Sequence, residues 1–292
     1  MKEIIILSGK GGTGKTSLTA SFAALANHAV IADCDVDAAD LHLVLNPTIN
    51  NTHDFISGNE AIINNELCDG CGICKDYCRF NAIVHDSDTN EYFVDPANCE
   101  GCAVCVEFCP EQCIDFPQRH CGQWFNSTTR FGPMVHARLA IGAENSGKLV
   151  SLVRDEARKL AQSQQAEMII VDGSPGIGCP VIASITGADH IVLIIEPSKA
   201  GKHDIERVLK LAQHFSIDTS ICINRWDIDN QIASEIEALA TTYNANLLGR
   251  IRYDLAVTQA QIAGQSVVEL TNQGAAKDIR QIWTKLQTLI ED

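Results

Sequence analysis

The segment Leu7–Ser17, LSGKGGTGKTS, constrains the fold more than any other part of the chain. It begins at the end of the apolar run IIIL and matches the phosphate-binding pattern G-x-x-x-x-G-K-[ST] from Gly9 to Thr16. Such a loop surrounds phosphates with backbone N–H groups at the start of a helix, so it needs a strand before it and a helix after it. The alternative, a glycine-rich turn without phosphate, is disfavoured by the GKT triplet that follows an apolar strand.

The pattern assigns individual roles within the loop. Lys15 is expected to contact the β and γ phosphates of a nucleoside triphosphate, and the Thr16 hydroxyl to coordinate Mg²⁺. A second lysine, Lys10, follows the first glycine directly and is not explained by the pattern. The predicted nucleotide-binding residues of the loop are Gly9, Lys10, Gly11, Gly12, Thr13, Gly14, Lys15, Thr16 and Ser17.

The flanking sequence predicts an α/β fold with a mostly parallel sheet. Apolar, β-branched runs at 3–9, 29–33, 167–176, 190–197, 219–225 and 246–251 read as buried strands. Helical stretches follow the loop and span 202–215 and 230–243, so helices are expected on both faces of the sheet. Ligands of such sheets gather at the carboxyl ends of the strands, where the phosphate loop also lies.

Charge and hydropathy indicate which kinds of partner the protein does not bind and in which cellular compartment it is expected. The 292 residues include 22 Lys and Arg against 37 Asp and Glu, a formal net charge of −15. This charge argues against non-specific binding to nucleic acid or an anionic membrane. The sequence has no apolar run long enough to span a membrane and no secretory leader pattern, so we expect a cytoplasmic protein.

Eight of the thirteen cysteines fall into two runs with the spacing C-x2-C-x2-C-x3-C. This spacing is typical of 4Fe–4S ligation, in which the fourth cysteine of each run serves the other cluster. One predicted cluster is therefore bound by Cys68, Cys71, Cys74 and Cys109, and the other by Cys99, Cys102, Cys105 and Cys78. Zinc is the alternative, but it leaves the third C-x2-C step of each run unexplained.

The two runs belong to an internal repeat with an offset of 31 residues, which aligns Ile63 with Val94 and Ile83 with Ile114. The repeat predicts a small α+β bacterial-type ferredoxin domain at 61–118, inserted into a discontinuous P-loop domain at 1–60 and 119–292. Arg79 stands where the second copy has a proline, and Cys113 aligns with an alanine, which suggests a packing residue rather than a ligand.

The chain resembles the MinD/Mrp-type ATPases with a deviant Walker A motif, relatives of the nitrogenase iron protein. It is most similar to the subgroup with an inserted ferredoxin domain. The resemblance covers nearly the whole chain and rests on GKGGTGKT, DCDVDAADLH, the cysteine insert, RFGPMVHARL, ENSGKL, DGSPGIGCP and INRWD.

The resemblance implies roles for residues that the loop pattern leaves open. Lys10 would reach across a dimer interface to the γ phosphate of the partner, Asp35 would orient the attacking water, and Asp172 would hold Mg²⁺ through water. Gly176 would follow the γ phosphate, and Asn224 would bind the purine with Asp227 as a weaker candidate. Cys179 is a candidate ligand of a bridging cluster, with Cys121 as a possible companion; the alternative for both is a small packing residue. Arg252 replaces a proline of the family, which leaves the outer wall of the base pocket open.

The functional hypothesis is a slow, dimer- or partner-activated ATPase that uses ATP, Mg²⁺ and two 4Fe–4S clusters. ATP-driven formation of a homodimer, or of a heterodimer with a related ATPase, would control transfer of electrons or of a cluster to a redox or iron–sulfur acceptor protein. One alternative is a MinD-like positioning or scaffold ATPase whose ferredoxin module is structural or sensing; a ferredoxin with a vestigial nucleotide fold is another. The amphipathic C-terminal stretch, 275–292, is expected to dock on the ATPase core rather than on a membrane.

Overall fold

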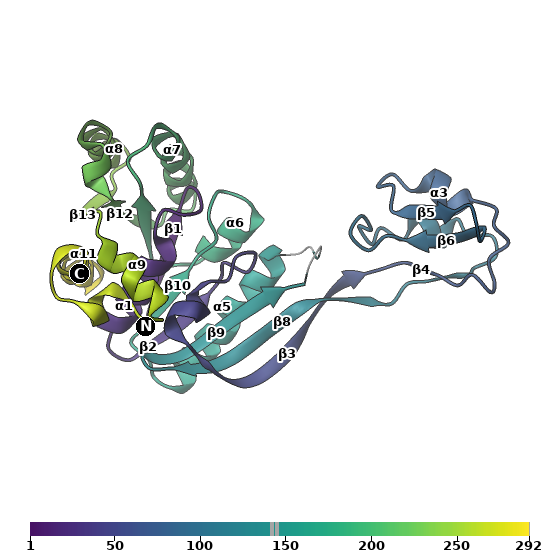
Figure 1. The fold of residues 1–292 in the computed structure, drawn as a ribbon, viewed down its shortest axis with the longest axis horizontal. Coiled ribbons are helices and arrows are strands. Elements are labelled where there is room, and N and C mark those ends of the chain that lie inside the picture. Colours follow the sequence, from purple (N-terminus) through teal and green to yellow (C-terminus); the bar gives the residue numbers. More distant parts are fainter. Residues whose placement is uncertain (141–142, 144–145, 292) are drawn as a thin grey trace. The chain divides into compact units, whose positions relative to one another are not determined.

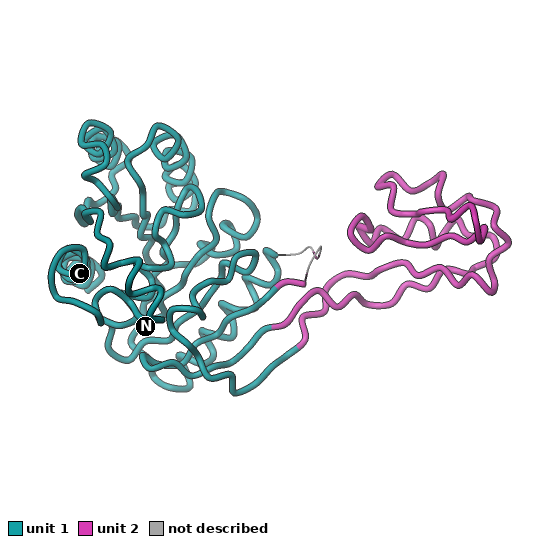
Figure 2. The backbone as a smooth tube through the Cα atoms, in the orientation of Figure 1, with its two compact units in different colours: residues 1–53, 124–138, 146–292 teal, residues 54–123, 139–145 magenta. Residues whose placement is uncertain are grey.

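The computed structural model describes residues 1–140, 143 and 146–291. Two residues of the ENSGKL motif, 144 and 145, lie outside this part. The chain divides into two compact units (Figure 2). Unit 1 comprises Met1–His53, Trp124–Arg138 and Ser146–Asp292, and unit 2 comprises Asp54–Gln123 and Leu139–Asn145. The predicted limits of the insert, 61 and 118, lie inside unit 2 and stay a prediction.

One nine-stranded sheet organises the described part of the chain (Figure 1). From β13 to β9 each strand runs parallel to its neighbours, which confirms the predicted mostly parallel sheet. The strand order is β13 (Asn246–Ile251), β12 (Asp218–Asn224), β11 (His190–Ile195), β1 (Lys2–Ser8), β10 (Met168–Asp172), β2 (Ala29–Asp33), β9 (Gly132–Leu139), β8 (Gln118–Thr129) and β3 (Thr48–Asn59).

Helices cover both faces of the parallel part of the sheet. Ile4 and Ile6 of β1 pack in one apolar cluster with α1 (Lys15–Leu25), α9 (Leu255–Ile262), α10 (Val267–Leu270) and α11 (Gly274–Glu291). Ile5 and Leu7 point to the opposite face, because side chains alternate along a strand, and they are equally buried. The other helices of unit 1 are α2 (Leu41–Leu45), α5 (Ser146–Ser163), α6 (Cys179–Ile185), α7 (Lys199–His214), α8 (Asn230–Thr242) and the 3₁₀ turn η1 (Trp226–Ile228).

The C-terminal helix α11 docks on the sheet, as its apolar face predicts. Trp283 lies in the core, with its ring centroid 4.9 Å from that of the fully buried Phe22 of α1. Ile279, Ile282 and Leu286 are buried beside it. None of the described helices is long and apolar enough to cross a lipid bilayer.

Unit 2 contains two short antiparallel sheets, each built from one strand of each sequence copy. Strand β4 (Ile62–Ile63) pairs with β7 (Ile114–Asp115), and β5 (Ile83–Asp86) pairs with β6 (Glu91–Val94). The short helices α3 (Ile73–Tyr77) and α4 (Val104–Glu107) begin inside the two cysteine runs. The register sets Ile63 against Ile114 and Ile83 against Val94, so the repeat-related pairs occupy equivalent positions in the two sheets.

Two strands that the sequence did not predict, β3 and β8, extend from unit 1 into unit 2. Strand β3 reaches from residue 48 to 59 and β8 from 118 to 129, across the limits of both units. Most of β3 is exposed to solvent, so it lacks the buried face that makes a strand recognisable in a sequence.

Candidate functional site

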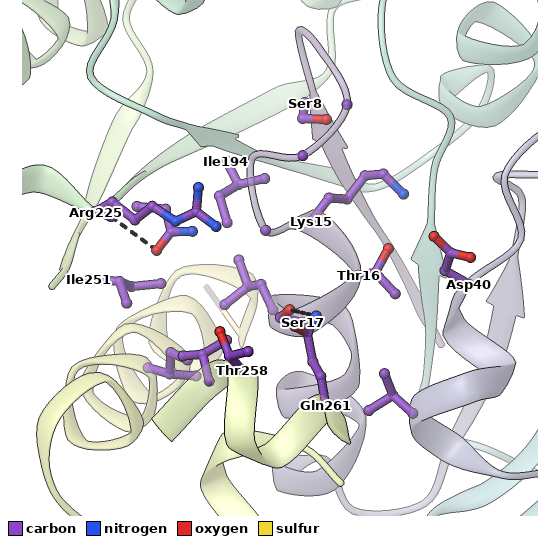
Figure 3. Close-up of a pocket in the computed structure, with 18 of the residues that line it drawn as sticks. Ser8, Lys15, Thr16, Ser17, Asp40, Ile194, Arg225, Ile251, Thr258 and Gln261 are labelled. Carbon is purple, nitrogen blue, oxygen red and sulfur yellow. Dashed lines mark hydrogen bonds between the residues drawn. The ribbon is translucent and has the colours of Figure 1, made fainter. Parts of the chain in front are cut away.

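A cavity of about 470 Å³ lies at the carboxyl ends of the parallel strands in unit 1. Figure 3 shows Lys15, Thr16 and Ser17 at the start of α1, with Arg225 and Ile251 on one side and Asp40 on the other. Residues from α9, among them Thr258 and Gln261, complete the lining. The cavity therefore lies where the phosphate loop predicts a nucleotide.

The loop conformation depends on its glycines. Gly12 and Gly14 have φ angles of 78° and 95°, in the left-handed region that disfavours residues with a Cβ. A Cβ at Gly11 or Gly12 would meet no atom within 4 Å, so the loop encloses open space, whereas one at Gly14 would collide with the Asn224 amide. The backbone thus forms a cradle of a size and polarity that suit a phosphate chain.

Lys15 lies between two carboxylates at the bottom of this cradle. Its Nζ is 3.0 Å from Asp35 Oδ2 and 3.0 Å from Asp172 Oδ1. Burial lowers the pKa of Lys15, but the Asp172 and Asp35 charges outweigh burial, so the net shift is upward and the ammonium stays charged. These contacts are ion pairs without well-directed hydrogen bonds, which leaves a buried cation with donors available for phosphate oxygens.

Thr16 and Asp172 form the predicted pair for Mg²⁺. The Thr16 hydroxyl donates to Asp172 Oδ2 at 2.9 Å, and Thr19 donates to Asp172 Oδ1 at 2.7 Å. Hydroxyl and carboxylate oxygens are suitable donors for this ion. Asp33 lies fully buried beside them, and burial and the Asp172 charge raise its pKa well above the ordinary value. One Asp33 carboxylate oxygen has no hydrogen-bond partner.

Lys10 does not join this group within its own chain. Its Nζ donates to the Ser198 hydroxyl at 3.2 Å and lies 3.8 Å from Glu196 Oε2. Ser198 caps the N-terminus of α7 by accepting from the Gly201 N–H. Lys10 is thus held against α7, away from the cavity that Lys15 occupies, in a partly exposed position.

Asn224 supports the loop rather than facing the cavity with a free amide. Its Nδ2 donates to the Thr13 carbonyl at 2.7 Å, and its Oδ1 accepts from the Arg225 N–H at 3.0 Å. Asp227 is likewise occupied, accepting from the Tyr253 N–H at 2.8 Å. Both residues predicted for purine binding therefore have hydrogen-bond partners within the protein, and Asn224 also lines the cavity.

Arg252 fastens the end of β13 to α11. Its guanidinium makes two hydrogen bonds, at 2.7 and 2.8 Å, to the two carboxylate oxygens of Asp278. Arg252 also lines the cavity, so this bidentate pair holds one residue of the cavity wall in place. No motif links the two residues, which lie 26 positions apart on different elements, so this contact could not be predicted.

Glu196 is a further residue that sequence reasoning missed. Besides its contact with Lys10, its Oε1 lies 3.5 Å from a guanidinium nitrogen of Arg225, which lines the cavity. The Glu196 carboxylate therefore pairs with both Lys10, the second lysine of the loop, and Arg225 in the cavity wall. It follows strand β11 directly, where a parallel sheet places ligand-facing residues.

The loop after Asp172 places the remaining candidates of unit 1. Gly176 has a φ of 93° and open space around its Cα, and its N–H donates to the Ser8 carbonyl at 3.0 Å. Cys179 is exposed at the start of α6.

Cys121, the possible companion of Cys179, is fully buried in unit 2. Its thiol donates to the Ser57 carbonyl at 3.1 Å, so it packs as a core residue.

The structure brings thiols of the two cysteine runs of unit 2 close together. Cys78, Cys99, Cys102 and Cys105 line one small cavity of about 20 Å³. Burial raises the pKa of the Cys74 thiol to about 11, and the neighbouring thiols of Cys68, Cys105 and Cys71 add to the rise. The Ile73 N–H lowers the pKa of the Cys71 thiol, but burial, Asp69 and the charge of Cys109 together raise it above its ordinary value.

Among the described residues, no group of three or more His, Cys, Asp or Glu side chains is placed as around a single metal ion. A 4Fe–4S cluster spreads its four thiolates farther apart than one ion does, because the iron–sulfide cube lies between them. The thiols of unit 2 are of the chemical type that ligates such clusters.

Comparison with known proteins identifies the nucleotide-binding part. The family model "CobQ/CobB/MinD/ParA nucleotide binding domain" matches residues 4–267. The uncharacterized protein MJ0578 of Methanocaldococcus jannaschii is 29% identical over 291 residues, covering 99% of this chain and 97% of that protein.

Solved structures share the fold. The cell division ATPase MinD of Pyrococcus furiosus has a TM-score of 0.57 at 15% identity, covering 99% of both chains. MinD of Pyrococcus horikoshii, solved with Mg-ADP, has a TM-score of 0.59 at 16% identity, covering 99% of this chain and 96% of that one. Together with the glycine cradle and the family match over 4–267, this fold shows that the chain belongs to the CobQ/CobB/MinD/ParA nucleotide-binding domain family.

Proposed function

We propose that the protein is a P-loop ATPase that binds Mg-ATP in the 470 Å³ cavity and hydrolyses it slowly. The observation that carries this proposal is the buried Lys15 ammonium between Asp35 and Asp172 at 3.0 Å, at the base of an open glycine cradle. In the absence of phosphate these carboxylates neutralise the lysine. When a triphosphate enters, its oxygens take their place.

The carboxylates that Lys15 leaves are then available for the other tasks of phosphoryl transfer. Mg²⁺, held by Thr16 and by Asp172, would neutralise charge on the phosphates. Asp35, released from its ion pair, would orient the attacking water. The loop at Gly176 would change position according to whether the γ phosphate is present. Positioning and charge neutralisation supply most of the catalysis in this reaction, so the set is sufficient for slow turnover.

Lys10 supports a dimer as the active form. Its side chain lies outside the cavity of its own chain and is about one third exposed. A hydrogen bond to Ser198 and an ion pair with Glu196 hold it near α7, and both contacts can break without a change in the fold. We propose that Lys10 binds the γ phosphate of a partner subunit, in a homodimer or in a heterodimer with a related ATPase. Such a lysine adds positive charge only when ATP and two chains are together.

The fold relatives favour a positioning or scaffold role for this dimer. They include MinD bound to MinC of Aquifex aeolicus and McdA of Cyanothece in complex with ATP. We propose that the ATP-bound dimer of this chain likewise binds a partner protein, and that hydrolysis releases it. We propose that the protein acts in the cytoplasm.

A second candidate function rests on unit 2. We propose that Cys68, Cys71, Cys74 and Cys109 hold one 4Fe–4S cluster and that Cys78, Cys99, Cys102 and Cys105 hold another. Such clusters would supply one-electron transfer to a redox or iron–sulfur acceptor protein. The grouping of the second set around one cavity and the exchange of strands between the copies support this proposal.

Two lysine variants test the ATPase proposal. Lys15→Ala is expected to abolish nucleotide binding by the monomer, measured by isothermal titration calorimetry. Lys10→Ala is expected to keep that binding and to lose both the dimer, seen by analytical ultracentrifugation with a non-hydrolysable analogue, and hydrolysis. Failure of the unmodified chain to dimerise when saturated with the analogue would refute the proposed dimer.

Iron analysis tests the second candidate separately. Anaerobically purified protein should be brown and contain about eight iron atoms per chain. A coupled redox function further requires that ATP changes the reduction potential or the reduction rate of the clusters. Iron that is present but insensitive to ATP would leave the positioning role with a structural cluster module.

A further inference from the structure

Cys113 is a thiol that neither cluster uses, and it lies against a predicted ligand. Its Sγ is 3.5 Å from Cys109 Sγ, and it is 4% exposed within the apolar core of unit 2. Cys109 is partly exposed. The sulfurs of a disulfide lie about 2.0 Å apart, so the two sulfurs of this pair must approach by roughly 1.5 Å to bond.

A tight turn produces the contact. The Gln112 N–H donates to the Cys109 carbonyl at 3.2 Å, and Gln112 adopts a left-handed conformation with φ of 50°. This turn brings residue 113 back toward residue 109. Pro110, Glu111 and Gln112 separate the two cysteines in sequence, and this turn ends before β7 begins at Ile114.

The first sequence copy has the same turn without the second thiol. There the Asn81 N–H donates to the Cys78 carbonyl at 3.4 Å, and Asn81 has a φ of 54°. Ala82, 2% exposed, occupies the position equivalent to Cys113, and its N–H lies 3.4 Å from Cys78 Sγ. The two turns therefore differ four residues after the cysteine: Cys109 is followed there by the thiol of Cys113, and Cys78 by the methyl group of Ala82.

We propose that Cys109 and Cys113 form a reversible disulfide in the cluster-free chain when a hydroperoxide is present. The partly exposed Cys109 reacts first to a sulfenic acid with release of water, and Cys113 then displaces a second water as the S–S bond forms. Two thiols and one hydrogen peroxide thus give one disulfide and two waters. In a reducing compartment, disulfides of this kind are transient and are reopened by thiols.

The disulfide would make the loading of the two cluster sites unequal. This consequence rests on the proposed cluster function, because it requires Cys109 to be a ligand. With Cys109 oxidised, the first site keeps three of its four thiolates, whereas the second site keeps all four. Oxidation would thus block one cluster selectively and reversibly.

Peptide mapping of the full-length, metal-free chain tests the disulfide without any cluster. The reduced protein is treated with equimolar hydrogen peroxide, blocked with N-ethylmaleimide and cleaved after glutamate and arginine. Cleavage after Glu107, Glu111 and Arg119 separates the two cysteines, so the disulfide joins fragment 108–111 to fragment 112–119. A thiol reductant is expected to separate them, and Cys78 is expected to be found alkylated.

The matched variant is Cys113→Ala, which gives the second copy the residue that the first copy already tolerates. In this variant fragment 108–111 should carry only an alkylated or further oxidised Cys109. Recovery of unlinked, alkylated 108–111 from the oxidised unmodified chain would overturn the proposal. A link from Cys113 to Cys68, its other thiol neighbour, would also overturn the assigned pair.

Iron loading tests the consequence. Reconstitution of the oxidised chain without thiol is expected to give about four iron atoms, against about eight for the reduced chain and for oxidised Cys113→Ala. Equal losses in both oxidised proteins would refute selective blocking. A reduced chain that binds no iron while the 109–113 disulfide still forms would refute the cluster proposal and leave the disulfide standing.

Discussion

Replacement of Glu196 by glutamine is expected to strengthen ATP-dependent dimerisation. In the monomer Glu196 holds Lys10 at 3.8 Å, and Ser198 accepts a hydrogen bond from the same ammonium. If Lys10 acts on the nucleotide of the partner, it must leave Glu196 when the dimer forms. Removing the carboxylate charge weakens the monomer arrangement and leaves the loop, Lys10 and Ser198 unchanged.

The size of the effect follows from the exposure of the pair. The side chains of Lys10 and Glu196 are 35% and 22% exposed, so solvent screens their attraction and the pair contributes about 0.5–1 kcal/mol. A symmetric dimer breaks two such pairs. The dimer dissociation constant should therefore fall by a factor of about 5 to 30, corresponding to roughly 1–2 kcal/mol. Added salt should reduce the difference, because it screens partly exposed charges.

Sedimentation velocity with Mg²⁺ and a non-hydrolysable ATP analogue measures the dissociation constant of the dimer. Glu235→Gln is the matched control, since it removes one carboxylate from an exposed pair with Lys202 of α7 and does not touch Lys10. Glu196 also contacts Arg225, so the affinity of the monomer for nucleotide is measured in parallel. An unchanged or weaker dimer in Glu196→Gln, with unchanged nucleotide affinity, would refute the inference that Glu196 holds Lys10 back.

Asn224→Ala should weaken Mg-ADP binding about fivefold, because it removes the hydrogen bond to the Thr13 carbonyl, worth about 1 kcal/mol; calorimetry that shows equal affinity would contradict a role for Asn224 in holding the loop. Burial, and to a smaller extent the His42 charge, lower the pKa of His136 to about 4. The unfolded chain therefore binds this proton more readily than the folded chain, and the free energy of unfolding falls as the pH drops from about 6.5 toward 4. Urea unfolding followed by circular dichroism should show about 2 kcal/mol more loss between pH 7 and 5 for the native chain than for His136→Gln. The exposed His120→Gln should behave like the native chain, and equal losses in all three proteins would exclude His136 as the cause.

The central fold could be predicted because its signals are local and repeated. Each parallel strand except β9 is a short apolar run that the sequence predicts, and the loop from Gly9 to Thr16 has a conformation that its own glycines dictate. Burial of the apolar face of α11 is equally local, since its spacing alone shows which residues point inward. The placement of Lys15, Thr16 and Asp172 follows from the same pattern once the strands are parallel.

The remainder depends on contacts between distant residues or on surfaces without a pattern. Strand β3 has alternating burial only near its end, at Phe55 and Ser57, so its sequence resembles a polar loop. The bidentate pair of Arg252 and Asp278 joins two elements that no motif connects. The direction of Lys10 is likewise a matter of tertiary structure, because the loop pattern is compatible with a lysine turned inward or outward.

The connectivity of the chain gives the nucleotide site a short path to the strands that enter unit 2. Asp35 is followed within a few residues by α2, which ends at Leu45, and Asn46 then turns the chain in a left-handed conformation with φ of 45° into β3. On the neighbouring strand, β9 pairs with β2 so that Asp33 lies opposite His136. A movement of Asp35 toward a γ phosphate therefore acts on a segment that is covalently continuous with β3. In the proposed coupling, nucleotide state would reach unit 2 through this covalent connection, without a separate relay of side chains.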